Sequence, residues 1–144
     1  MLLGEYEQRL DDKNRITIPA RLRDHFLTGV YVNRGIDECL QAFNPEGWDR
    51  YLEAETARLD LFTREGRRMQ RFLHAGVATE LDRQGRIALS ARMIERARIG
   101  RDIVVAGTGD RLEIWNRDTW RRDFDEFEGS VDVAAERLAR EPHR

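Results

Sequence analysis

The chain has 144 residues, with 25 Lys and Arg against 27 Asp and Glu and a formal net charge of −2, a length that suits one compact domain or two small ones. Hydrophobic residues make up 40% of the sequence, which excludes a disordered chain as the default, and the single cysteine, Cys39, excludes a disulfide framework or a multi-cysteine zinc site. No segment has the hydrophobicity of a signal peptide or a membrane span, so we expect a cytoplasmic protein that does not contact a membrane.

The charges are unevenly distributed along the chain. Residues 64–98 hold nine arginines against four acidic residues, a local charge of +5, whereas residues 118–144 hold five arginines against eight acidic residues, a local charge of −3. Two interpretations are open, a charge-separated surface or a solvated helix face of mixed charge.

An internal repeat organises the whole sequence. Residues 10–22 (LDDKNRITIPARL) match residues 81–93 (LDRQGRIALSARM) at an offset of 71, and a second block matches at an offset of 72. A unit of about 70 residues buries little core alone, so we expect two halves that pack on each other around a pseudo-twofold axis. The predicted divisions are a first unit with a linking helix at 1–75, a second unit at 76–128 and a tail at 129–144.

Each half begins with a predicted strand, a tight turn and a second strand. Apolar residues alternate over 6–10 and 16–18, and again over 77–81 and 87–89. Asn14 and Gly85 hold the same turn position, and both residue types adopt positive φ readily. A short helix then follows, starting at Pro19 in the first half and capped by Ser90 in the second.

Two more strands and a helix complete each half. The predicted strands cover residues 30–32, 39–43, 103–105 and 111–115, and the glycines at 107 and 109 indicate a hairpin turn. Asn44 and Asn116 are predicted N-caps of the helices that follow. Trp48 and Trp120, at equivalent places in the repeat, are predicted core anchors.

The first half continues into the linking helix. A helical stripe is predicted for Trp48, Tyr51, Leu52, Leu59 and Phe62, and residues 65–75 predict a further helix whose short apolar face is Met69, Phe72 and Leu73. In the tail, residues 132–140 predict a last helix, and residues 141–144 are expected to fray.

The sequence is poor in groups for catalysis. Ser90 is better explained as a helix cap than as a nucleophile, and His25, His74 and His143 have no mutual spacing of metal ligands. The glycine pair at 107–109 is too short for a dinucleotide fingerprint. We therefore expect no enzyme activity, metal, cofactor or small-molecule substrate.

The duplicated turn is the strongest functional signal. An aspartate stands four residues before an arginine in both copies, Asp11 before Arg15 and Asp82 before Arg86. One interpretation is structural, a turn-stabilising ion pair worth only ~0.2–1 kcal/mol if exposed. The functional interpretation is that the carboxylate holds the guanidinium, so that less entropy is lost when it binds a phosphate or a guanine edge.

These motifs resemble the MraZ family of bacterial proteins. The motifs LDDKNRITIPAR, LDRQGRIALSAR and LEIWNRDTW carry the resemblance, which extends from Met1 to about Phe127. It implies an α+β fold of two tandem swapped-hairpin units of the SpoVT/AbrB type, with a pseudo-twofold β-barrel-like core and flanking helices. It also implies a nucleoid-associated transcription regulator that forms rings and binds direct repeats of double-stranded DNA upstream of its own division and cell-wall gene cluster.

The resemblance also implies which residues bind DNA. They are Arg15 and Arg86, with Lys13 and Arg83 as adjacent candidates for phosphate contact and Asp11 and Asp82 as positioning carboxylates. Asn14 and Ser90 replace the glycine and proline of many family members, and neither change touches these aspartates or arginines.

Two other interpretations stay open. The chain is an oligomeric scaffold whose acidic C-terminal third binds a protein, with purely structural turns, or it is an antitoxin-like regulator. The two fused units argue against the latter, because antitoxins of this type are usually single-unit chains. Steep salt dependence of DNA binding would favour the DNA-binding interpretation over the scaffold.

Overall fold

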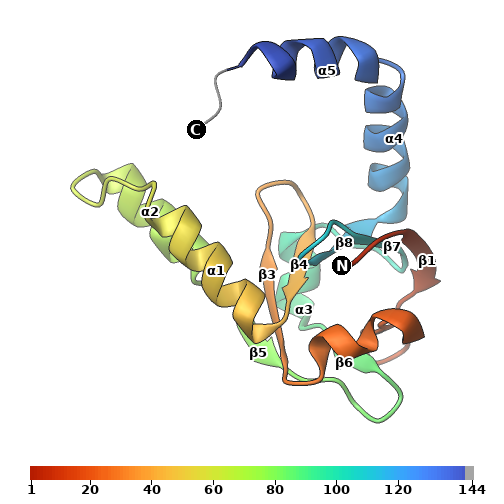
Figure 1. Ribbon diagram of the computed structural model, residues 1–144. Helices are drawn as coiled ribbons and strands as arrows, with labels where there is room; N and C mark the ends of the chain where they lie inside the picture. The colour runs from red at the N-terminus through yellow and green to blue at the C-terminus, as the bar shows by residue number, and fades with distance from the viewer. Residues whose placement is uncertain (142–144) are drawn as a thin grey trace.

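The computed structural model describes residues 1–141, which form a six-stranded antiparallel sheet, a two-stranded ribbon and flanking helices (Figure 1). The strands are β1 (Glu5–Arg9), β2 (Arg15–Thr17), β3 (Val30–Arg34), β4 (Leu40–Phe43), β5 (Val77–Thr79), β6 (Arg86–Ala88), β7 (Asp102–Gly107) and β8 (Leu112–Asn116). The helices are the 3-10 helix η1 (Ala20–Phe26), α1 (Pro45–Thr56), α2 (Arg64–Leu73), α3 (Ala91–Arg96), α4 (Arg117–Glu128) and α5 (Val131–Arg140). The predicted α+β class is confirmed.

The two halves exchange strands around a pseudo-twofold axis. The order in the large sheet is β1-β7-β8-β4-β3-β5, so β1 pairs with a strand of the second half and β5 with a strand of the first. At the centre, Gln41 of β4 lies opposite its repeat equivalent Glu113 of β8. In the ribbon, Ile16 of β2 lies opposite its equivalent Ile87 of β6. The axis therefore passes through both pairs.

The main apolar core lies between the ribbon and the sheet. Ile16 and Ile87 point into it and are essentially inaccessible, which follows from the alternation of each three-residue strand. They pack with Ile18, Val30, Leu89, Ile103 and Ile114. Burial of these side chains holds the ribbon on the sheet.

A second apolar cluster lies under the hairpin of α1 and α2. It contains Phe43, Trp48, Tyr51 and Leu73, with Trp48 only 7% exposed. The Trp48 ring is stacked on Tyr31 and packs edge-on against Phe43. The prediction that Trp48 anchors the core is confirmed.

The predicted turn and cap residues are confirmed. Asn14 and Gly85 have φ angles of +55° and +75°. The side chains of Asn44, Ser90 and Asn116 each accept a hydrogen bond from the backbone N–H three residues later, at 2.8, 3.1 and 3.2 Å. These caps fix where α1, α3 and α4 begin.

The prediction that Trp120 anchors the core is wrong. Its side chain is half-buried, packs edge-on against Trp115, and donates its indole N–H to the Glu5 carboxylate at 2.7 Å. The first half has α2 to cover its tryptophan, whereas α4 rises from the sheet and leads into α5, which lies well clear of the sheet (Figure 1). The repeat therefore preserves the residue type but not the layer that buries it.

The predicted helical stripe is confirmed for Trp48, Tyr51 and Leu52 of α1, but its extension to Phe62 is wrong. α1 ends at Thr56, and Phe62 is 96% exposed in the turn before α2. Asp60 accepts a hydrogen bond from the N–H of Phe62 at 3.0 Å, and Thr63 caps α2, so local polar side chains stabilise a turn there. Met69 of the predicted apolar face of α2 is likewise exposed.

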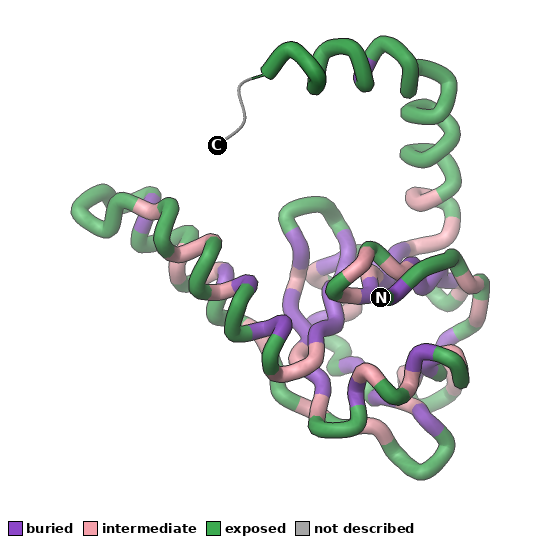
Figure 2. Tube along the Cα trace, viewed as in Figure 1, coloured by how far each residue is buried: buried purple, intermediate pink, exposed green. Residues whose placement is uncertain are grey.

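The last two helices project from the body of the molecule. Nearly every residue of α4 and α5 is exposed along this projection (Figure 2). α5 forms where the tail predicts a helix, while the predicted fraying falls mostly on residues 142–144, outside the described part. No helix within residues 1–141 combines the length and the apolar character needed to cross a membrane.

Candidate nucleic-acid interface

The first turn is organised by one carboxylate. Asp11 Oδ1 accepts hydrogen bonds from the backbone N–H groups of Lys13 at 2.9 Å and Arg15 at 2.8 Å. Asp11 Oδ2 accepts from Arg15 Nε at 2.7 Å. A single side chain thus fixes both the turn backbone and the direction of the arginine.

The second turn repeats this arrangement. Asp82 Oδ1 accepts from the backbone N–H groups of Gln84 and Arg86, both at 2.9 Å, and Asp82 Oδ2 accepts from Arg86 Nε at 2.8 Å. In addition, Arg86 Nη2 donates to the side-chain oxygen of Gln84 at 2.7 Å. Arg86 is therefore held by two side chains of its own turn.

The ribbon brings the two turns together. Arg15 lies opposite Ala88 and Arg86 opposite Thr17, so the arginines occupy diagonal positions on the face opposite buried Ile16. Arg86 Nη1 lies 4.0 Å from Asp11 Oδ2, which joins the turns of the two halves. The structure thus brings together all four residues of the duplicated motif.

The four side chains are partly exposed and charged. The exposed fraction is 26% for the side chains of both arginines and 33% and 35% for those of Asp11 and Asp82. The backbone N–H of Arg15 lowers the pKa of Asp11 most strongly, partial desolvation opposes this, and the Arg15 side chain lowers it further. Arg86 lowers the pKa of Asp82 in the same order. Each carboxylate accepts from an Nε donor and Gln84 accepts from Arg86 Nη2, so the Nη groups of Arg15 and Nη1 of Arg86 remain to meet another acceptor.

Each turn is also bound to the other half. The N–H of Leu89 donates to the carbonyl of Asn14 at 2.9 Å, and the N–H of Ile18 donates to the carbonyl of Gly85 at 2.8 Å. The turns therefore hold each other in place, and a shift of one moves the other.

Two further arginines support the turns, and they are not equivalent in the repeat. Arg23 Nε donates to the carbonyl of Ile18 at 2.9 Å, and its guanidinium covers Gly85, where an added Cβ would lie 2.1 Å from Nε. Arg101 Nη1 donates to the carbonyl of Asp11 at 3.1 Å. Arg23 stands near the motif in sequence, but Arg101 is 90 residues away from Asp11 and has no sequence signal.

The predicted phosphate-contacting residues lie at the tips of the turns. Lys13 and Arg83 are both exposed there. They are not repeat equivalents, since Lys13 aligns with Gln84 and Arg83 aligns with Asp12. Each turn thus has one additional cation at its tip, and the two cations occupy repeat positions that differ by one residue.

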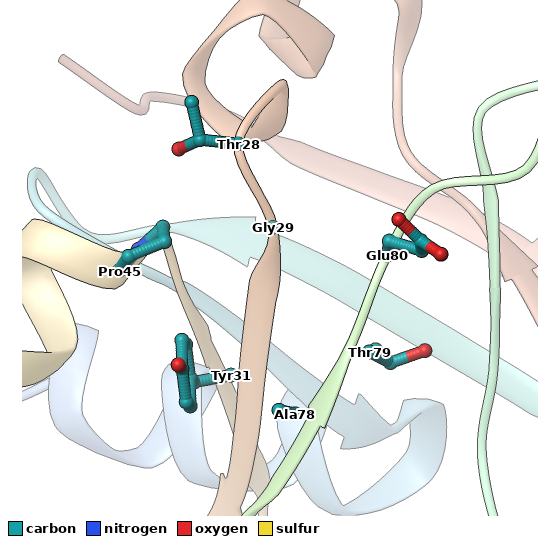
Figure 3. A pocket seen from close by; sticks show the side chains of 7 residues that line it. All are labelled: Thr28, Gly29, Tyr31, Pro45, Ala78, Thr79 and Glu80. Atoms are coloured by element: carbon teal, nitrogen blue, oxygen red, sulfur yellow. The ribbon is translucent and has the colours of Figure 1, made fainter.

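Elsewhere the described residues offer little for catalysis. An open pocket of about 520 Å³ beside β5 is lined by Thr28, Gly29, Tyr31, Pro45, Ala78, Thr79 and Glu80 (Figure 3). In this lining no hydrogen bond joins the hydroxyl of Thr28 or Thr79 to the Glu80 carboxylate, so no nucleophile is paired with a base there. Residues 1–141 also contain no group of three or more His, Cys, Asp or Glu placed to hold a metal ion.

Comparison with known proteins matches both halves of the chain to one family. The sequence model of the family described as "MraZ protein, putative antitoxin-like" matches residues 1–72 and again residues 72–141. Transcriptional regulator MraZ of Roseiflexus castenholzii is 39% identical over 140 residues, covering 96% of this chain and 97% of the relative. The proteins of the same name from a Roseiflexus species and a Thermoanaerobacter species are 38% and 36% identical over 140 residues, covering 96% of this chain and 97% and 94% of the relatives.

Proposed function

Because this chain belongs to the MraZ family, whose compared members are named transcriptional regulators, we propose that it regulates transcription by binding double-stranded DNA with the β2–β6 ribbon. The family consists of regulators and not of enzymes. One observation carries the choice of site. The two arginines of the repeat, each held by an aspartate, lie on one outward face and are joined by the contact of Arg86 with Asp11.

The shape and chemistry of the ribbon support base readout. The major groove of B-DNA is about 12 Å wide and admits a two-stranded β-ribbon, and arginine binds the O6 and N7 atoms of guanine bidentately. Arg15 and Arg86 are aligned in advance by Asp11 and Asp82, so little side-chain entropy is lost on binding. Lys13 flanks the pair and binds a phosphate.

The charge of the whole chain does not oppose this function. Affinity for DNA depends on the cations that meet the phosphates, and the formal net charge of −2 includes the acidic tail far along the sequence. Arg83 and Lys13 supply cations at the turn tips, beside the two central arginines.

We further propose the assembly and the target that the family resemblance implies. The chain forms a ring-shaped homo-oligomer on the nucleoid and binds direct repeats upstream of its own division and cell-wall gene cluster. Several subunits on adjacent repeats gain effective concentration, so that each ribbon contact is individually weak and the assembly binds tightly.

Fluorescence anisotropy tests the DNA-binding proposal. Labelled duplex from upstream of the gene and a scrambled duplex are titrated with the full chain at two salt concentrations. The double variant Arg15→Ala/Arg86→Ala is expected to lose the preference for the native duplex, with ~1–3 kcal/mol lost per bidentate contact. A log–log plot of affinity against salt is expected to fall with a slope near −0.9 per neutralised phosphate.

A matched control removes the same charge elsewhere. Arg50→Ala/Arg58→Ala changes two exposed arginines on and just beyond α1 and is expected to bind as wild type does. Equal and weak binding of both duplexes, unchanged by Arg15→Ala/Arg86→Ala, would show that the turns are structural and would favour a protein-binding scaffold.

A further inference from the structure

The end of the chain forms an acidic arm, which we define as residues 123–136 of α4 and α5. Its base is anchored to the sheet, because the Trp120 indole N–H donates to Glu5 at 2.7 Å and Arg121 pairs with Glu7. The arm itself contains six acidic residues and no basic residue. It also exposes the apolar side chains of Phe124, Phe127, Val131 and Val133 by 45 to 62%. Such clustered apolar exposure on a charged helix indicates a contact surface.

A basic groove of about 420 Å³ lies between α2 and the loop after β3. Phe72 lies in this groove, with the guanidinium carbons of Arg34 and Arg96 at 5.6 and 5.9 Å from its ring centroid. The walls expose the apolar side chains of Ile36 and Met69. Of the residues of α2, Arg68 and Glu65 line the groove, and the other three arginines of this helix lie on α2 outside the lining. The groove thus combines apolar contact area with a cationic rim.

We propose that the acidic arm of one copy docks into the basic groove of a second copy of this chain. The two surfaces are complementary in charge, since the acidic residues of the arm meet arginines of the groove. They are also complementary in apolar contact, since the two phenylalanines of the arm meet the exposed apolar wall of the groove. Within one chain the surfaces stay apart, because α5 stands well clear of α2 (Figure 1). Because the base of α4 is fixed to β1, the acidic arm projects from the body of its own chain and is accessible to a second copy.

This contact is heterologous, because the arm and the groove are different surfaces. A bound pair still offers one free arm, on one copy, and one free groove, on the other, so association continues head to tail until the chain of subunits closes. The inference rests on the homo-oligomer of the proposed function and identifies its interface. The β2–β6 ribbon belongs to neither surface and remains available to DNA.

Two charge-reversal variants of the full chain test the interface. Asp125→Arg/Glu128→Arg disables the arm, and Arg68→Glu/Arg71→Glu disables the groove, all at exposed positions. In analytical ultracentrifugation without DNA, each is expected to associate at least about tenfold more weakly than wild type. An equimolar mixture of the two is expected to recover larger assemblies of alternating copies, because the native arm of the second variant fits the native groove of the first, and the reversed arm of the first fits the reversed groove of the second. Combining all four changes in one chain is expected to restore larger assemblies.

The control variant Asp49→Arg/Glu53→Arg reverses two exposed charges on α1 and is expected to assemble as wild type does. Circular dichroism melting checks that every variant is folded. A monomeric wild type, or oligomers unchanged by both reversals, would overturn the interface. Neither result bears on base readout, which the Arg15→Ala/Arg86→Ala titration measures separately.

Discussion

Arg86 contacts the aspartates of both halves, with Nε at 2.8 Å from Asp82 Oδ2 and Nη1 at 4.0 Å from Asp11 Oδ2. Arg15 is paired only with Asp11 among the described ion pairs. The duplicated motif is therefore not strictly symmetric, and Asp11 lies closest to its centre.

Removing the charge of Asp11 is expected to weaken DNA binding more than the same change at Asp82. Asp11→Asn removes the carboxylate that holds Arg15, and the same carboxylate is the second one near Arg86. Asp82→Asn affects only Arg86, which still donates a hydrogen bond to Gln84. We expect about a tenfold loss for Asp11→Asn and a smaller one for Asp82→Asn in anisotropy titrations. Asp12→Asn, an exposed neighbour, is the control, and equal losses at Asp11 and Asp82 would contradict the asymmetry.

A side chain at Gly85 is expected to destabilise the second turn. Its φ of +75° disfavours an L side chain, and a Cβ would lie 2.1 Å from Arg23 Nε. We expect Gly85→Ala to lower the free energy of unfolding by ~1–3 kcal/mol in urea titrations. Arg23→Ala is expected to relieve part of this loss, so additive effects of the two changes would argue against the clash. Asn14→Gly, in the equivalent turn, serves as the tolerated comparison.

Truncating the buried isoleucines of the ribbon, which lie on the pseudo-twofold axis, is expected to lower the free energy of unfolding strongly. Ile16 and Ile87 are buried to 0% and 1% exposure and lie opposite each other. Ile16→Ala and Ile87→Ala are each expected to cost ~2–5 kcal/mol, and the double variant less than the sum because the two cavities merge. Chemical denaturation measures all three values, and losses well under 1 kcal/mol would mean that the ribbon does not depend on this contact.

Acidic pH is expected to destabilise the protein through His25. Desolvation, with a smaller contribution from the N-terminal charge, lowers the pKa of His25 below its usual value of 6.5. The unfolded chain therefore binds the proton first, so this stability contribution is present above pH 6.5 and is lost as the pH falls toward the folded pKa. Melting temperatures of wild type and His25→Gln between pH 7.5 and 5 should converge at the acidic end, and parallel curves would contradict this origin.

The site was predictable from sequence to the extent that it is local. Asp11 and Arg15 are four residues apart across a turn that Asn14 closes with positive φ, so spacing alone brought them together. The support from Arg101 was not predictable, because β1 and β7 place it beside Asp11 across 90 residues. The environment of Trp120 also depends on which helix follows, and the repeat carries no information about that.

The exchange of strands between the halves also determines how the molecule is made. The strand Glu5–Arg9 pairs with Asp102–Ala106. It is the first strand to be synthesised, so it remains unpaired until most of the chain has left the ribosome. Such distant pairing slows folding and ties both repeats into one transition. Despite its tandem sequence, the chain should therefore melt as a single cooperative unit, and neither repeat should fold when expressed alone.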